Sequence, residues 1–385
     1  MKKRIAIFGS TGSIGTQALD VMRSHPELFE AEVLTASSNV DLLIAQALEF
    51  QPNAVVILDQ THYPKLRDAL SQTDIKVFAG QESLEQIAEM ETIDLVLMAI
   101  VGFAALKPVL KTLETGKTLA IANKETFVVA GEIMMNSALN SNSLILPVDS
   151  EHSAIYQCLN GESTRAIDKI ILTASGGPFR GKNKTFLETI TAKDALKHPN
   201  WDMGAKITID SASLMNKGFE MIEAKWLFGL KAEQIEVLVH PQSIIHSMVQ
   251  FNDGSVKAQL GLPDMRLPIQ YAMSWPDRIS NEFPKMDFSK YPNLTFEQPD
   301  IATFPNLELA RKAMIQGGNM PCIVNAANEM VVHAFLSDRI GFNFMPVLIE
   351  EAMEQIPFIQ KPSLEDYFET DRITRIKLLE RIKTL

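Results

Sequence analysis

Two carboxylates follow the apolar run LILPV, as Asp149 and Glu151 of the segment LPVDSEHSAIYQ. In an extended chain alternate side chains point to the same side, so both carboxylates would face one point. Two negative charges this close repel each other unless a cation or a proton lies between them. A set of ligands made only of oxygen suits Mg²⁺ or Mn²⁺ rather than zinc. The alternative reading is a helix N-terminus, with Ser150 as the N-cap and Glu151 in the first turn.

A third carboxylate, Glu220, belongs to the segment SASLMNKGFEMIEAKW. If this segment is helical, Asn216 and Lys217 precede Glu220 by four and three residues and share its face. Such a polar cluster is also typical of a solvated salt-bridge face. The spacing alone therefore does not connect Glu220 to a metal.

Lys124 follows the apolar stretch KTLAIA and stands between Asn123 and Glu125. In a parallel sheet the carboxyl ends of the strands face the ligand crevice, where a lysine can contact a cofactor or a substrate oxygen. A surface lysine after a strand is the other reading.

Two further loops have the composition of an anion-binding loop and of a lid over the substrate site. TASGGPF (173–179) ends a strand-like run in a serine and two glycines, which suits an anion-binding loop of backbone amides. HPNWDMG carries Trp201 and Met203 in a proline- and glycine-flanked loop, which predicts a lid over about 182–206 that excludes water. An ordinary turn and a surface apolar cluster packed on a neighbouring domain are the alternatives.

The glycine-rich segment GSTGSIG (9–15) predicts a nucleotide site. It follows the first strand and opens the first helix, whose N-terminal amides can bind a pyrophosphate. The spacing GxxGxxG is looser than the usual fingerprint, so its position after a strand carries the prediction. Ser37, Ser38 and Asn39 end the second strand where an acidic residue would bind the ribose of NAD, and this absence of an acid favours NADP.

The elements that must position these residues alternate between strand-like and helix-like segments from residue 3 to 149. This pattern predicts a Rossmann-like, doubly wound parallel sheet covered on both faces. We expect four parts: a cofactor domain over 1–149, an α/β catalytic domain over 150–274, a linker over 275–300 and a helical bundle over 301–385.

The composition of the chain limits the kinds of molecule that we expect it to bind. The 385 residues carry a net charge of −11, which disfavours nucleic acid and an anionic membrane. Cys158 and Cys322 have no CxxC spacing, and no apolar run is long enough to span a membrane. The apolar run after MKKR is too short for a signal peptide, so we expect a cytoplasmic protein.

The motifs GSTGSIG, VGFAAL, ANKET, PVDSEHSA, SGGPF, HPNWDMG, DSASLMNKGFE, HPQSIIHSMV and LPDMRLPIQYA occur in this order. Over its whole length the chain resembles the 1-deoxy-D-xylulose 5-phosphate reductoisomerase family of the non-mevalonate isoprenoid pathway. The resemblance implies a metal-assisted rearrangement of the substrate, followed by reduction with NADPH to 2-C-methyl-D-erythritol 4-phosphate. It also implies Mg²⁺, Mn²⁺ or Co²⁺ as the metal and a homodimer as the assembly.

The resemblance assigns roles to individual residues. Asp149, Glu151 and Glu220 match the metal ligands, and Lys124 with Ser150 matches positions at the reacting end of the substrate. The implied substrate-binding residues further include Ser175, His198, Ser211, Asn216 and Lys217. Trp201 and Met203 match the lid. The implied cofactor site comprises Thr11, Gly12, Ser13, Ile14, Ser37, Ser38, Asn39, Asn123, Glu125 and Gly204.

Two positions depart from the pattern of the family. Many members carry a basic residue where Ser38 stands, and often another where Ala205 stands. Both would favour the 2′-phosphate of NADPH, so hydroxyl and amide donors must compensate here.

Two other functions fit parts of the sequence. A semialdehyde or homoserine dehydrogenase could share the architecture but would not need three carboxylates at a metal. An NADPH-binding sensor without activity would not need Lys124, Asp149 or Glu151, so neutral substitutions there would be harmless.

Overall fold

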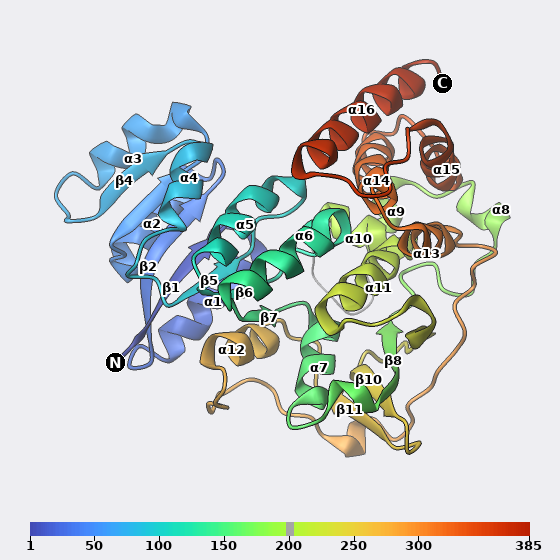
Figure 1. The fold of residues 1–385 in the computed structure, drawn as a ribbon, viewed down its shortest axis with the longest axis horizontal. Coiled ribbons are helices and arrows are strands. Elements are labelled where there is room, and N and C mark those ends of the chain that lie inside the picture. The colour runs from blue at the N-terminus through green and yellow to red at the C-terminus, as the bar shows by residue number, and fades with distance from the viewer. Residues whose placement is uncertain (198–203) are drawn as a thin grey trace. The chain divides into compact units, whose positions relative to one another are not determined.

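The computed structural model describes residues 1–197 and 204–385 (Figure 1). They form two compact units. The first comprises Met1–Thr126, Glu132–Ser153 and Asp264–Pro284, and the second comprises Phe127–Gly131, Ala154–Pro263 and Lys285–Leu385.

A seven-stranded sheet, parallel throughout, forms the centre of the first unit in the order β4-β3-β2-β1-β5-β6-β7. The strands are β1 (Lys3–Phe8), β2 (Phe29–Ala36), β3 (Ala54–Ile57), β4 (Lys76–Ala79), β5 (Leu95–Met98), β6 (Thr118–Ile121) and β7 (Ile145–Pro147). The central strands are almost wholly apolar and buried, as a parallel sheet covered on both faces requires. The predicted fold class is confirmed, although the sequence analysis did not identify β4, an edge strand with exposed residues.

The strand order reverses beside β1, because β2 to β4 lie on one side of it and β5 to β7 on the other. This is the topological switch point at which open α/β sheets bind ligands, at the carboxyl ends of the strands. The helices between the strands are α1 (Ser13–Ser24), α2 (Val40–Phe50), α3 (Tyr63–Ala69), α4 (Gln81–Ile87), α5 (Leu106–Glu114) and α6 (Glu125–Ser141), and α7 (Ser150–Leu159) follows β7.

Residues 264–284 belong to the first unit, although the sequence analysis placed them in the central domain and the linker. Helix α12 (Arg266–Ser274) packs against α1, and the Lys3 ammonium donates to the carbonyls of Met273 and Trp275. A segment distant in sequence thus completes the first unit. The four domain ranges expected from the sequence stay a prediction.

The second unit contains a four-stranded mixed sheet in the order β11-β10-β8-β9. Its strands are β8 (Ile167–Ala174), β9 (Ile235–Val239), β10 (Ile245–Phe251) and β11 (Val256–Leu260). β8 and β9 are parallel, whereas β10 is antiparallel to both β8 and β11. The runs KIILTA, EVLVH and SVKAQL predict β8, β9 and β11, whereas for β10 the sequence indicated only the start of the strand.

Helices cover this sheet and form the C-terminal part of the chain. They are α8 (Lys184–Leu187), α9 (Ala192–Ala195), α10 (Ala205–Ala212), α11 (Met215–Phe228), α13 (Asn306–Gln316), α14 (Met320–Leu336), α15 (Met345–Gln355) and α16 (Leu364–Lys383). Helix α14 packs on α15 and α16, and α13 packs on α11. The expected C-terminal helices are therefore present, and one hydrophobic core joins them to the sheet.

The stretch 285–300 has little regular structure, as predicted, apart from the short turn Phe288–Lys290 and one bridge between Glu297 and Val239. Among the described residues, no helix is both long and apolar enough to cross a membrane.

Candidate active site

The glycine turn after β1 has a backbone that larger residues could not adopt. Gly9 has φ +93°, and a Cβ on Gly15 would lie 2.2 Å from the carbonyl oxygen of Gly9. Gly12 is the N-cap of α1, and no side chain caps that helix. The amide of Gly12 donates to the Gly9 carbonyl at 3.1 Å, whereas the amides of Ser13 and Ile14, in the first turn of α1, are available to a pyrophosphate.

A buried polar network that the sequence analysis missed fixes this turn. Gln46 of α2 accepts from the Ser10 hydroxyl at 2.7 Å and donates to the Ser10 carbonyl at 2.9 Å. The Thr35 hydroxyl accepts from the amide of Gly9 at 2.9 Å. A glutamine inside the apolar helix VDLLIAQALEF was the available signal, because a buried amide needs partners.

The turn after β2 presents Ser37, Ser38 and Asn39, all exposed. Asn39 is the N-cap of α2, and its side-chain oxygen accepts from the amide of Leu42 at 3.2 Å. Its remaining amide group and the two serine hydroxyls can serve as donors. This turn suits a 2′-phosphate through neutral donors rather than through a bidentate arginine.

Asn123 has a structural role in addition to the cofactor contact predicted for it, which stays a prediction. Its side-chain amide donates to the carbonyls of Ile100 and Gly102, and its oxygen accepts from the amide of Thr126. These bonds tie the loop after β5 to the start of α6. Asn123 therefore shapes the wall of the switch point, and Glu125, the first residue of α6, is buried beside it.

Lys124 pairs with Asp149, with 2.5 Å between Nζ and Oδ2. Both side chains are largely buried, and His152 Nδ1 lies 3.7 Å from the same carboxylate oxygen. Burial opposes ionisation of Asp149, but the charge of Lys124 and the nearby His152 ring hold its pKa far below the usual range. Asp149 is thus a carboxylate at any physiological pH.

The VDSE segment turns into a helix immediately, so the extended geometry expected for it is wrong. The carbonyl of Asp149 accepts from the amide of Ser153, which makes Asp149, and not Ser150, the residue that precedes the first turn of α7. Glu151 lies in that turn and accepts from the Ser150 hydroxyl at 2.6 Å. A helix N-terminus stabilises both carboxylates, so a helix that starts here is compatible with the metal site predicted for Asp149 and Glu151, which stays a prediction.

In the second unit, the loop after β8 brings two predicted substrate residues together. Gly176 and Gly177 both have positive φ, and the Ser175 hydroxyl accepts from the amide of Gly177. A Cβ on Gly177 would lie 2.8 Å from the Ser211 carbonyl oxygen. The SGG loop therefore packs against the C-terminal end of α10, which carries Ser211.

Helix α11 presents the residues of the MNKGFE motif. The side chain of Asn216 donates to Glu220 at 2.5 Å, and the Lys217 ammonium donates to the other oxygen of Glu220. Lys217 is 4% and Glu220 1% exposed, so this is a buried cluster and the solvated-face reading is wrong. A buried carboxylate held by two donors is pre-oriented for a ligand.

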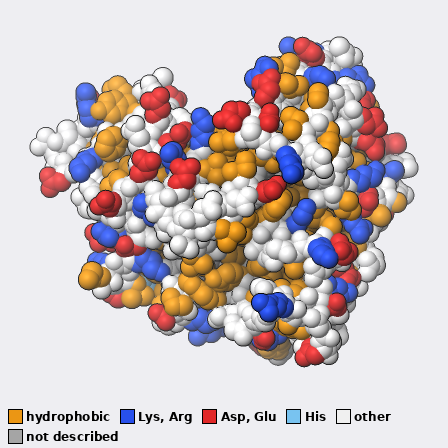
Figure 2. All heavy atoms as spheres, viewed as in Figure 1, with side chains coloured by type: hydrophobic (Ala, Val, Ile, Leu, Met, Phe, Trp, Pro, Cys, Tyr) orange, Lys and Arg blue, Asp and Glu red, His pale blue; other side chains and the backbone are white. Residues whose placement is uncertain are grey.

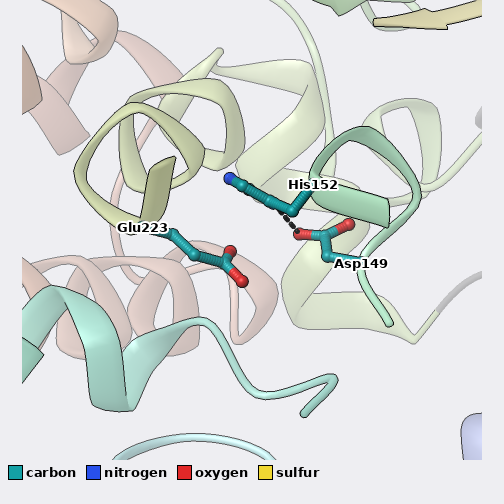
Figure 3. Close-up of side chains that lie close together, drawn as sticks. All are labelled: Asp149, His152 and Glu223. Atoms are coloured by element: carbon teal, nitrogen blue, oxygen red, sulfur yellow. Dashed lines mark ion pairs between the residues drawn. The ribbon is translucent and has the colours of Figure 1, made fainter. Parts of the chain in front are cut away.

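Two groups of side chains among the described residues bring possible metal ligands within 4.8 Å of one another. The first is Asp149, Glu151 and Glu220, whose oxygens fit a hard ion such as Mg²⁺ or Mn²⁺. The second is Asp149, His152 and Glu223, drawn in Figure 3 with the His152 ring beside Asp149. Glu223 follows Glu220 by three residues on α11, a spacing that could have identified it from the sequence.

Some predicted residues cannot be placed. His198, Trp201 and Met203, with most of the lid tip, lie outside the described residues. Gly204 is exposed and is the N-cap of α10. Charged side chains of both signs are interspersed over the face drawn in Figure 2, so an anionic ligand would depend on local donors.

A glycine turn at the switch point of a parallel sheet, together with a carboxylate metal cluster, defines a nucleotide-dependent, metal-assisted α/β enzyme. Three family models match the chain: 1-deoxy-D-xylulose 5-phosphate reductoisomerase over residues 5–131, its C-terminal domain over 145–228, and the DXP reductoisomerase C-terminal domain over 260–377. The chain belongs to the 1-deoxy-D-xylulose 5-phosphate reductoisomerase family.

Similar proteins span the whole chain. The reductoisomerase of Bacteroides fragilis is 62% identical over 374 residues, which is 97% of this chain and 96% of that protein. That of Porphyromonas gingivalis is 56% identical over 375 residues, with 97% of both chains covered. The structure of the Zymomonas mobilis reductoisomerase in complex with NADPH has a TM-score of 0.94 at 40% identity, covering 100% of both chains. A DOX-P reductoisomerase in complex with NADPH, fosmidomycin and magnesium has a TM-score of 0.94 at 38% identity, covering 99% of this chain and 98% of that one.

Proposed function

We propose that this chain rearranges 1-deoxy-D-xylulose 5-phosphate and reduces the product to 2-C-methyl-D-erythritol 4-phosphate, a step of isoprenoid precursor biosynthesis. The observation that carries the proposal is the set of three clustered carboxylates in a chain that belongs to the reductoisomerase family. The enzyme is an NADP-dependent oxidoreductase that uses a divalent metal.

Asp149, Glu151 and Glu220 would hold the metal. A bound divalent ion supplies a Lewis acid for the carbonyl and hydroxyl oxygens of the substrate. Lys124 keeps Asp149 ionised, and Lys217 pairs with Glu220, so both carboxylates are oriented before any ligand arrives. Loss of either lysine would leave a buried carboxylate without its counter-charge.

Lys124 and Ser150 would contact the reacting end of the substrate. Lys124 precedes α6 at the carboxyl end of β6, and its ammonium can donate to a substrate oxygen while it remains paired with Asp149. Ser150 donates to Glu151, so it can orient that carboxylate as well as contact the substrate.

Ser175, Ser211, Asn216 and Lys217 would bind the substrate, mainly through its phosphate. The support is local: the SGG loop packs on the end of α10, and α11 follows α10 after a single turn. Hydroxyl, amide and ammonium donors at this point suit a phosphate, and a few such donors suffice in an acidic protein. His198 would join them.

The cofactor would bind along the carboxyl edge of the first sheet. The stretch Thr11 to Ile14 would hold its pyrophosphate, mainly through the amides at the start of α1, and Ser37, Ser38 and Asn39 would hold its 2′-phosphate. The resemblance to the family adds Asn123, Glu125 and Gly204 to the proposed cofactor residues. NADPH supplies the hydride. The chain would hold the nicotinamide next to the rearranged substrate, with Trp201 and Met203 proposed to close over them.

We further propose a homodimer located in the cytoplasm. β11 is an edge strand whose first residues are exposed, and an unpaired edge is a common site of self-association. Both cysteines are free and buried, which is typical of a reducing compartment.

The test follows NADPH absorbance with 1-deoxy-D-xylulose 5-phosphate, with and without Mg²⁺, and again after a chelator is added. We expect NADPH consumption only when the substrate and the metal are both present, and recovery when metal is restored. Oxidation without metal would favour an ordinary dehydrogenase. Cofactor binding without any turnover in metal-loaded protein would favour the sensor.

A further inference from the structure

Helix α10 carries Ser211, one of the residues proposed to bind the substrate phosphate. The helix has eight residues, and its buried side chains are those of Thr208, Ile209, Asp210 and Ala212. Two of these four are apolar. Apolar packing has no direction, so it defines the rotation of a short helix about its axis only weakly. A directional contact is needed to fix the side to which Ser211 points.

A buried hydrogen bond supplies such a contact. The side-chain amide of Asn328, on α14, donates to Oδ1 of Asp210 at 2.7 Å. Asp210 is 1% and Asn328 0% exposed, so water does not compete for this bond. A hydrogen bond to a charged acceptor is roughly twice as strong as one between neutral groups. The bond therefore fixes the rotation of α10 at the residue directly before Ser211.

The charge of Asp210 is a disadvantage beside a phosphate site, because a carboxylate next to Ser211 repels a phosphate. Lys206, one turn earlier on α10, compensates for it with an ammonium 2.9 Å from Oδ2 of Asp210. The two oxygens of Asp210 thus have separate partners, one on its own helix and one on α14. Only the bond from Asn328 connects this carboxylate to another helix, which indicates a positioning role.

Asn328 contributes to this contact as a donor. Its Oδ1 is buried and has no hydrogen-bond partner among the described residues. A buried acceptor without a partner is costly, and an apolar side chain would avoid that cost. The amide group of Asn328 therefore serves the fold through the N–H that it gives to Asp210.

Helix α14 is itself held in place within the C-terminal helices. Glu329, the neighbour of Asn328, accepts from Arg375 of α16 at 2.6 Å. Arg375 also donates twice to Asp371, at 2.7 and 2.8 Å. Asn328 thus projects from a helix whose position polar contacts with α16 define.

The end of α10 is also in contact with the other part of the proposed phosphate site. A Cβ on Gly177 would lie 2.8 Å from the Ser211 carbonyl oxygen, so the SGG loop lies directly against this end of the helix. The amide of Leu214 donates to the same carbonyl at 3.2 Å, in the turn that leads into α11. A rotation of α10 would therefore displace Ser211 and disturb the loop that carries Ser175.

We propose that Asn328 and Asp210 are positioning residues for the phosphate site, and that their buried bond lets the C-terminal helices hold Ser211 toward the substrate phosphate. Both residues act through Ser211 and are not catalytic. The proposal deepens the function proposed above and rests on it.

Steady-state kinetics of Asn328→Leu test this role, because leucine has a similar volume and no donor. We expect the KM for 1-deoxy-D-xylulose 5-phosphate to rise about five-fold or more, while the KM for NADPH changes less than about two-fold. If the leucine variant does not fold, Asn328→Ser, whose side chain is too short to reach Asp210, should give the same result. An unchanged substrate KM in a folded variant, or an equal rise in the KM for NADPH, overturns the proposal.

Asn325, one turn earlier on α14, offers a matched control. It is also fully buried, and its Oδ1 likewise has no partner in the described part of the chain. Its amide donates to Glu329 of its own helix at 3.3 Å and not to α10. Asn325→Leu should therefore leave the substrate KM within about two-fold of the wild type. A rise equal to that of Asn328→Leu would assign the effect to the packing of α14 and refute the positioning role.

An exchange of the two side chains tests the bond itself. Asn328→Asp alone places two carboxylates together and should raise the substrate KM at least as much as Asn328→Leu. Adding Asp210→Asn restores an amide–carboxylate bond in the reverse direction and should return the KM to within about two-fold of the wild type. A double variant that is no better than Asn328→Asp contradicts a direct bond between these positions.

Binding of inorganic phosphate, followed by phosphorus NMR, gives a measurement that needs no turnover. NADPH at saturation occupies the phosphate contacts of the cofactor site, and no metal is added. We expect Asn328→Leu to weaken phosphate binding about five-fold or more and Asn325→Leu to leave it unchanged. Equal affinity in Asn328→Leu and the wild type, or no saturable binding to the wild type, overturns the proposal. Absence of turnover in the metal-loaded wild type would instead refute the proposed function, and the phosphate affinities would still decide the positioning role.

Discussion

Gly218 of the MNKGFE motif lies where α11 packs against Ala310 of α13, and Gly218→Ala tests how this contact supports the site. The new Cβ would lie 2.4 Å from the Cβ of Ala310, whereas apolar carbons normally approach to about 3.5–4.0 Å. The two helices must then separate by about 1 Å. Overpacking of this kind costs ~1–3 kcal/mol, and the better helix propensity of alanine returns ~1 kcal/mol.

The single variant mixes these two effects, so the decisive quantity is the coupling with Ala310→Gly. That second substitution removes the methyl group that the first one meets. In a double-mutant cycle the clash term appears as a coupling energy of ~1–3 kcal/mol, while the propensity terms cancel. Urea unfolding followed by circular dichroism, at constant m-value, measures all four proteins.

The same pair of substitutions should affect the site, because α11 carries Asn216, Lys217 and Glu220. We expect Gly218→Ala to raise the KM for the substrate several-fold and Ala310→Gly to restore it. If the two substitutions are additive within ~0.5 kcal/mol, the helices do not pack as described and the reasoning is refuted. A coupling energy without any change in KM would mean that the contact supports the fold alone.

Glu151→Gln should lose most of the turnover while the melting temperature stays close to that of the wild type, because an oxygen ligand loses its charge; unchanged Mg²⁺ dependence of the rate would remove Glu151 from the metal site. Ser38→Arg adds a charge at the turn after β2 and should lower the Kd for NADPH but not for NADH, as measured by cofactor fluorescence, and an equal effect on both would show that this turn does not contact the 2′-phosphate. Burial raises the pKa of Cys158 to about 11, above the value of a free thiol, so the unfolded chain loses its proton first and stability falls as pH rises from about 9 to 11. Cys158→Ala should flatten the decline of the urea midpoint over this range, and an unchanged slope would assign the decline to other groups.

Much of the fold was readable from local pattern. The run KRIAIF predicted β1 with the observed bounds, because its last four residues are continuously apolar, as the buried part of a strand covered on both faces must be. The missed elements have a weaker pattern. β4 is an edge strand with alternating exposure, and β10 carries His246 and Ser247 inside a buried strand.

The composition of the candidate site was also readable. Its motifs are short and contiguous, so the chemistry of GSTGSIG, VDSE and MNKGFE is visible without a fold. The geometry of these motifs could not be predicted from the sequence. Asp149 and Glu151 were expected on an extended chain, but the amide of Ser153 bonds to Asp149 and starts a helix there.

The sequence by itself determined the alternating sheet, the glycine turn and the residue types available to a metal and a phosphate, because each depends on neighbours within a few positions of the chain. The tertiary structure alone decided that Lys217 and Glu220 are buried, that Asn123 ties two loops together, and that 264–284 joins the first unit. Each of these outcomes depends on contacts between residues far apart in the sequence. The burial of a side chain and its hydrogen-bond partners depend on which surfaces of the folded chain meet. The spacing of residues within a short segment does not determine this.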